Sequence, residues 1–229
     1  LVLVLLVVRV VSFEWREKVA SDRWQGVWTG ANVVASYGIP LLWGIALTSL
    51  LAGVPVGEDK EFTGNVFDLF SWYSVLGGVA FMALFAWHGS VFITLRTTGA
   101  MKERAHHLSL RLAPFSVLLT IAFLAATLWT GVDANEKGLV GGLVIIPLAV
   151  AALLVAWFMA GRRREGVAFA STCVAIVLSV TLLFVELFPR VMVSSTDFAW
   201  SLTTSNASSS HYTLVFMTRL DTGAPVAGA

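Results

Sequence analysis

Charge and cysteine are both scarce in this sequence. Only 13% of the 229 residues are charged, about half the share of a typical soluble domain, whereas 57% are hydrophobic. The net charge is +1, and the 15 Lys and Arg residues form no concentrated basic face, which argues against a nucleic-acid partner. Cys173 is the only cysteine, which excludes a disulfide framework, an iron–sulfur cluster and a cysteine-based zinc site. These shortages exclude an ordinary cytosolic enzyme and indicate a polytopic membrane protein.

Long apolar segments are abundant, and ionisable residues fall almost entirely between them. Five segments qualify as membrane spans by length and composition: 29–52, 69–95, 112–130, 139–160 and 167–188. Each meets the requirement of about 17–25 residues for a helix that crosses a bilayer, with tilt in the longer ones. The sequence therefore predicts an all-α, polytopic transmembrane helical bundle with five full spans.

Each end of the chain carries part of a further span. Residues 1–13, LVLVLLVVRVVSF, would rise only about 20 Å as a helix, against a hydrocarbon core of about 30 Å. We expect them to be the second half of a spanning helix of a longer protein. A signal-peptide remnant is the alternative, but its positive charges would precede the apolar run. Residues 211–218 begin another apolar segment, and the polar tail 219–229 that follows cannot span a membrane.

The basic residues sort consistently between alternate loops. One set of loops, at 14–28, 96–111 and 161–166, together with the adjoining helix ends, contains eleven Lys and Arg residues: Arg9, Arg16, Lys18, Arg23, Arg96, Lys102, Arg104, Arg111, Arg162, Arg163 and Arg164. The alternate loops contain three: Lys60, Lys137 and Arg190. Because short cationic loops stay on the cytoplasmic side, we expect the first set to be cytoplasmic and the loops at 53–68, 131–138 and 189–210 to face outward.

Few residues could carry chemistry within the bilayer. Arg9 and Glu14 lie near a cytoplasmic helix end, where a carboxylate flanked by arginines could collect protons and pass them inward; on the residues alone, an interfacial cluster that pairs with itself is the simpler interpretation. His88 is the only histidine within a span, and we favour a hydrogen-bonding role in helix packing over haem ligation. For Glu186 we favour a carboxylate at the membrane edge, close to Arg190. The sequence contains no metal-ligand cluster and no catalytic nucleophile with its base.

A series of sequence words resembles a known family. RVVSFEWR, GIPLLWGIALTSLLAGVP, FTGNVFDLFSWYSVLGG, HGSVFITLRTTG and FPRVMVSSTDFAWSLTTSNASSSHYTLVFMT occur in order over residues 1–218. Together they resemble subunit II of the bacterial cytochrome bd quinol oxidases. By this resemblance, residues 1–68 contain the end of helix three and helix four of a first four-helix bundle. Residues 69–188 contain helices five to eight of a second bundle, and 189–218 contain an outer loop and the start of helix nine. The tail 219–229 is atypical, and helices one and two are outside this chain.

The resemblance also implies a role. Subunit II pairs with a homologous subunit I in the bacterial inner membrane. Subunit I holds two haems b and one haem d and oxidises quinol, and oxygen is reduced to water. Subunit II itself binds no haem or metal and has no catalytic residue; it can hold a structural quinone, contacts lipid and can be joined by small single-span accessory subunits. Glu14 matches an acidic residue in the family phrase F-[DE]-aromatic-R, proposed to lie on a proton route, and Arg9 matches the arginine before it.

Two other functions stay open on the residues alone. A secondary transporter would be expected to have broken helices, internal repeats and charged pairs at mid-membrane. A purely structural membrane subunit would have the same sequence features without proton chemistry at Glu14.

Overall fold

The computed structural model describes residues 1–59, 61–134, 138–208, 213 and 216–217. Its helices are α1 (Val2–Arg16), α2 (Asp22–Ala52), α3 (Trp72–Arg96), α4 (Gly99–Ala134), α5 (Gly138–Gly161) and α6 (Glu165–Leu187). Two 3₁₀ turns, η1 (Val66–Leu69) and η2 (Phe198–Trp200), and two short strands, β1 (Arg190–Met192) and β2 (Leu202–Thr203), complete the elements. The strands pair antiparallel, with Arg190 opposite Thr203.

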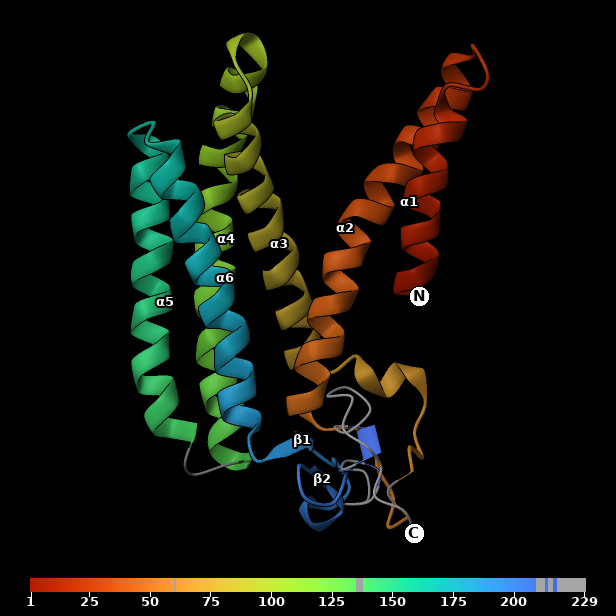
Figure 1. Ribbon diagram of the computed structural model, residues 1–229, viewed down its shortest axis with the longest axis vertical. Coiled ribbons are helices and arrows are strands. Elements are labelled where there is room, and N and C mark those ends of the chain that lie inside the picture. Colours follow the sequence, from red (N-terminus) through yellow and green to blue (C-terminus); the bar gives the residue numbers. More distant parts are fainter. Residues whose placement is uncertain (60, 135–137, 209–212, 214–215, 218–229) are drawn as a thin grey trace.

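The helices run roughly parallel to one another and form two groups (Figure 1). Helices α3 to α6 pack side by side, while α1 and α2 form a hairpin that leans on this bundle. The turns α1–α2, α3–α4 and α5–α6 lie at one end, which we call the turn end; the strands lie at the other, the sheet end. Five helices, α2 to α6, are long and apolar enough to cross a membrane, so the expected number of full spans is confirmed.

Several helices extend well beyond the apolar segments that predicted them. The expected loop at 96–111 is wrong, because α4 begins at Gly99 and continues to Ala134. The expected loop at 14–28 is likewise mostly helical, and only residues 17–21 separate α1 from α2. Hydropathy measures transfer into a bilayer, whereas helix formation continues through polar residues with good helix propensity, such as those in MKERAHHLSLRL. At 161–166 the break is confined to residues 162–164.

The ends of the chain fit the earlier expectations only in part. Residues 1–13 are helical within α1, as expected of a partial span. The segment 211–218 lies largely outside the described residues, and the tail 219–229 lies entirely outside them.

Small residues bring α2 and α3 into close contact near the sheet end. A Cβ atom added at Gly44 of α2 would lie 2.7 Å from the Cα of Gly78 on α3. One added at Gly78 would lie 2.8 Å from the carbonyl oxygen of Leu41. Thr48 faces Gly77 and donates its hydroxyl to the carbonyl of Gly44 at 2.7 Å. Glycines at these positions let the two backbones approach, which is how many membrane helices associate.

Two apolar cores fill the α3–α6 bundle. The core nearer the sheet end contains Tyr73, Phe81, Phe123 and Leu182, with Leu51 of α2. The core nearer the turn end is built around Trp87, which is fully buried against Leu84, Val91, Ala113 and Leu153. Buried apolar contacts therefore join the helices of this bundle toward both of its ends.

At the sheet end, the segment after α6 is pinned across the end of α2. The backbone of Val193 accepts from Val54 N at 2.9 Å and donates to Leu50 O at 3.0 Å. Ser195 N donates to Val54 O at 3.1 Å, and the hydroxyl of Ser194 donates to Val56 O at 3.1 Å. Gly53 ends α2 with φ of +97°, and an added Cβ would lie 3.2 Å from Ser195 Cα. This network covers the bundle end with two segments that are distant in sequence.

At the turn end, ion pairs tie the start of α4 to the α5–α6 turn. Arg163 binds the Glu103 carboxylate through both guanidinium nitrogens, at 2.6 and 2.9 Å. This hydrogen bonding raises the pKa of the Arg163 guanidinium above its already high value. Lys102 pairs with Glu165 at 3.0 Å. The polar extension of α4 is therefore held against the neighbouring helices by charge.

Candidate functional site

The two residues that the sequence placed on a proton route lie on different faces of α1. Glu14 lies at the turn end with 72% of its side chain exposed, and its ion pair is with Lys18, at 3.7 Å. Arg9 instead lines a groove between the α1–α2 hairpin and the bundle. Five residues correspond to about 140° around an α-helix, so the two side chains diverge. The structure therefore does not bring Arg9 and Glu14 together as one cluster.

An aromatic cluster surrounds the end of α1 next to Glu14. The rings of Trp15, Trp24 and Trp28 lie with centroids 5.6–6.3 Å apart. Trp24 Nε1 donates to the carbonyl oxygen of Trp15 at 2.7 Å. This cluster fixes the short turn between α1 and α2, and with it the position of Glu14 at the helix end.

A line of polar side chains runs between α1 and α2, starting two residues before Glu14. Ser12 is buried and donates to the carbonyl oxygen of Arg9 at 2.8 Å. The Asn32 amide donates to Ser12 Oγ at 3.0 Å, and Ser36 donates to Asn32 Oδ1 at 3.3 Å. We call Ser12, Asn32 and Ser36 the polar line. It leads from the turn end toward the interior of the hairpin, where Ser36 reaches the groove that Arg9 lines.

That groove has a volume of about 440 Å³ and is mostly apolar. Pro40 and Trp43 of α2 form one wall, while Phe81 and Phe85 of α3 form the other. Its lining residues come from α1, α2, α3 and α6, and the ribbons of α2 and α3 diverge toward the turn end (Figure 1). Arg9 is its only charged lining residue among those described, so a positive charge is held beside an apolar space.

His88 is committed to contacts within the bundle. Its Nδ1 lies 2.7 Å from Thr172 Oγ1 on α6, and its ring stacks on Phe169 with centroids 4.7 Å apart. The interpretation as a hydrogen-bonding packing residue is confirmed. Within the described ranges, no three His, Cys, Asp or Glu side chains gather in a way that could hold a metal ion.

Thr172→Val is expected to cost about 0.5–1 kcal/mol of stability, because it removes the hydroxyl partner of His88 while keeping side-chain volume. Denaturant unfolding of the detergent-solubilised protein measures this loss. Thr97→Val, at the exposed end of α3, is the matched control, since Thr97 bonds only its own helix backbone in the contacts found here. Equal stability of T172V and wild type would contradict the assigned hydrogen bond.

Glu186 lies in the last turn of α6, in keeping with the expected place near the end of a span, but its surroundings are not those of a surface carboxylate. It is fully buried, and neither carboxyl oxygen has a hydrogen-bond partner among the residues that the structure describes. No ion pair joins it to Arg190 within the described part of the chain. The reason is a cradle of two glycines: Oε2 packs against Gly131 of α4, and a Cβ added at Gly142 of α5 would lie 2.8 Å from Oε1.

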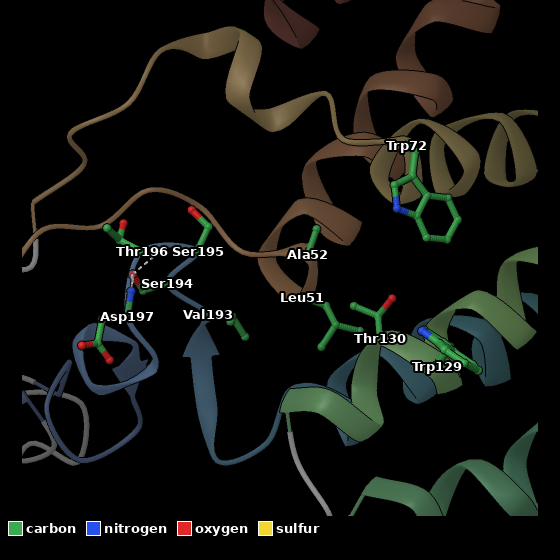
Figure 2. A pocket seen from close by; sticks show the side chains of 10 residues that line it. All are labelled: Leu51, Ala52, Trp72, Trp129, Thr130, Val193, Ser194, Ser195, Thr196 and Asp197. Atoms are coloured by element: carbon green, nitrogen blue, oxygen red, sulfur yellow. Dashed lines mark hydrogen bonds between the residues drawn. The ribbon is translucent and has the colours of Figure 1, made fainter.

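A second pocket, of about 430 Å³, opens at the sheet end. Figure 2 shows Trp72 of α3 and Trp129 and Thr130 of α4 on one side, with Ser194 and Asp197 of the pinned segment on the other. Trp72 directly precedes Tyr73 in the chain, and Thr130 directly precedes Gly131. Residues that line the pocket are therefore next in the chain to Tyr73 and Gly131, which lie near Glu186.

The sequence reasoning missed the polar line and the burial of Glu186. Asn32 and Ser36 stand four residues apart in an otherwise apolar segment, a spacing that places both on one helix face and could have indicated the line. The position of Glu186 had no such signal, because its cradle comes from α4 and α5, more than forty residues earlier.

Comparison with known proteins places the chain in a family. A family model described as cytochrome bd terminal oxidase subunit II matches residues 1–223. The cytochrome bd ubiquinol oxidase subunit 2 of Bacillus subtilis (strain 168) is 36% identical over 222 residues, covering 95% of this chain and 64% of that protein. The cytochrome bd-I ubiquinol oxidase subunit 2 of Escherichia coli (strain K12) is 30% identical over 254 residues, covering 95% and 66%. The chain thus spans less than two thirds of the length of these relatives.

A solved structure supports the same fold. A chain in the structure of bd oxidase from Geobacillus thermodenitrificans superposes with a TM-score of 0.66 at 15% identity, covering 97% of this chain and 67% of that one. The helix order described above is therefore that of a known membrane fold. With the family match over nearly its entire length, this chain belongs to the cytochrome bd terminal oxidase subunit II family.

Proposed function

We propose that this chain is part of the second subunit of a quinol:oxygen oxidoreductase in a bacterial inner membrane, where it supports a catalytic subunit I. The complex oxidises quinol, reduces dioxygen to water and so contributes to a proton gradient. The family match over residues 1–223 is the observation that carries this proposal. In this assignment the turn end faces the cytoplasm, in keeping with the eleven Lys and Arg residues found there and in the adjoining helix ends.

The haems of such a complex, two of b type and one of d type, belong to subunit I in this proposal. The contacts of His88 support this placement, because its Nδ1 is bonded to Thr172 and its ring is stacked on Phe169 inside the bundle. The division into the end of one bundle (1–68), a second bundle (69–188), a loop with the start of a further helix (189–218) and an atypical tail remains part of the proposal.

The contribution of this chain to the reaction is proton delivery from the turn end. Glu14 is exposed to solvent at the end of α1, where it can take up a proton. The polar line of Ser12, Asn32 and Ser36 begins two residues before Glu14 in the chain, on the opposite side of α1, and continues to the groove. Polar side chains inside a membrane bundle are costly and often mark ion and proton pathways, so this row supports a polar route into the hairpin. Arg9, at the far end of the row, holds a positive charge that favours nearby anionic groups.

Glu14→Gln in the complete complex is expected to lower the rates of quinol-driven oxygen uptake and proton uptake together, because general acid–base groups on a proton route typically contribute large rate factors. Asn32→Leu, which interrupts the polar line, should lower both rates in the same way. Glu17→Gln is the matched control, since Glu17 is a neighbouring exposed carboxylate outside the line. The measurements are oxygen consumption with a soluble quinol and pH changes on the cytoplasmic side of vesicles.

Unchanged rates in Glu14→Gln and Asn32→Leu would refute proton delivery and leave a purely structural subunit. Purification of the protein without haem, together with solute movement, would instead support a transporter and refute the oxidase assignment. Haem d absorbance in the purified complex separates these outcomes without mutagenesis. Partners beyond subunit I, including lipid, a structural quinone and small single-span accessory subunits, are part of the same proposal.

A further inference from the structure

Glu186 is a carboxyl group enclosed by helices on several sides. Its side chain is 0% exposed, and it touches the backbone of two other helices at Gly131 and Gly142. At these two positions any side chain would collide with the carboxyl oxygens, so the glycines create the space that the carboxyl fills. A carboxyl group at this depth is therefore an integral part of the packing between α4, α5 and α6.

Among the residues whose side chains the structure describes, none neutralises a negative charge on this group. On α3, the titratable neighbour is Tyr73, whose hydroxyl lies 2.9 Å from Thr127 Oγ1 on α4. Helix α5 contains no titratable residue. Arg190, four residues after Glu186, makes no ion pair with it, and the side chains of Asp133 and Lys137 lie outside those described. An ionised carboxylate buried without a hydrogen bond or a counter-charge is strongly disfavoured, whereas the neutral acid tolerates this environment.

A route for exchange lies close by. The sheet-end pocket is lined by Trp72 and Thr130, the residues directly before Tyr73 and Gly131 (Figure 2). Ser194, Ser195 and Asp197 line its opposite side, so the lining includes polar residues. A proton leaving Glu186 toward the sheet end would reach a pocket that has polar lining residues.

We propose that Glu186 is a proton-binding site: its carboxyl group holds one proton inside the α3–α6 bundle and exchanges it through the sheet-end pocket. Binding forms a single O–H bond on one carboxyl oxygen, with the proton supplied by water in the pocket. The proposed delivery route at Glu14 lies at the turn end, away from the sheet-end pocket, so Glu186 is a separate site. It does not depend on the proposed oxidase activity, because an intact bundle is sufficient for it.

Infrared spectroscopy of the purified full-length protein, with ¹³C-labelled glutamate, tests the first half of the proposal. We expect a protonated-carboxyl C=O band that persists from mildly acidic to mildly alkaline pH and disappears in Glu186→Gln. If Glu186→Gln retains this band and loses an ionised-carboxylate band instead, the proposal is overturned. Gly142→Ala is a second test, which still applies if Glu186→Gln fails to fold. It keeps every carboxyl group but crowds Oε1 of Glu186, so the same band should shift. Gly89→Ala, with open space around it, should leave the band in place.

Transfer into D₂O tests the second half. The band should move to lower frequency in wild type as the proton exchanges, and the exchange should slow at least several-fold in Thr130→Phe, which fills the pocket. Thr97→Phe, at the opposite end of the bundle, is the control and should exchange like wild type. Equal exchange rates in Thr130→Phe and wild type would overturn the proposed route. Because the readout is a vibrational band, its failure is distinguishable from a failure of the proposed oxidase function.

Discussion

Replacing Gly78 with alanine is expected to destabilise the protein by about 1–3 kcal/mol, because the added methyl group has no space between α2 and α3. The new Cβ would lie 2.8 Å from the carbonyl oxygen of Leu41 and 2.6 Å from the side chain of Ile45. A side chain can rotate away, but the Leu41 carbonyl belongs to the backbone of α2, so relief requires the two helices to separate. Thermal unfolding in detergent measures the loss.

Gly89→Ala provides a matched control on the same helix. No atom lies within 4 Å of a Cβ added there, and alanine has the higher helix propensity, so this change should be neutral or slightly stabilising. If Gly78→Ala and Gly89→Ala have the same unfolding temperature, the close contact of α2 with α3 is contradicted. Gly44→Ala, on the opposite face of the contact, should reproduce the effect of Gly78→Ala.

Trp87→Ala is expected to cost about 3–5 kcal/mol, the range for deleting a large buried aromatic side chain. Trp87 is fully buried among Leu84, Val91 and Leu153, and its Nε1 donates to Ser109 Oγ at 3.2 Å. The substitution leaves a cavity in the core nearer the turn end and removes the partner of a buried hydroxyl. Lipid cannot fill the cavity, because helices enclose it.

Two further variants separate the causes of that loss. Trp87→Phe retains most of the ring volume but not the hydrogen bond, so its cost should be intermediate. Trp157→Ala on α5 is the matched control, since that side chain is 39% exposed on the outside of the bundle and its removal leaves no enclosed cavity. Denaturant unfolding, or the temperature at which protease sites become accessible, compares the three. A cost at Trp157 equal to that at Trp87 would contradict the assigned core.

The number of membrane spans could be predicted from the sequence because ionisable residues mark where the chain leaves the apolar phase. The helix ends could not, because α2 and α4 continue through polar residues once they have left that phase. The extension of α4 is stabilised by a contact between Glu103 and Arg163, sixty residues apart. Such a pair is a tertiary interaction, and no local pattern in MKERAHH indicates it.

Of the candidate site, only the exposed residue Glu14 could be predicted from the sequence. Glu14 was selected from its position at a helix end, and the structure leaves it exposed there. The divergence of Arg9 follows from helical geometry and could have been calculated from the five-residue spacing. The burial of Glu186 could not, because it requires Gly131 and Gly142 to stand opposite it on two other helices. Backbone proximity of this kind is a property of the folded bundle.

The close contact of α2 with α3 lies near the sheet end, so the α1–α2 hairpin can pivot about that contact. From Gly44 to Asp22 the helix extends over 22 residues, or about 33 Å. A rotation of about 5° at the glycine contact would therefore move the turn between α1 and α2, with the tryptophan cluster and Glu14, by roughly 3 Å. The glycine contact near the sheet end therefore helps determine the position of Glu14 at the turn end. A methyl group added at Gly78 should displace Glu14 as well as the helices at the contact.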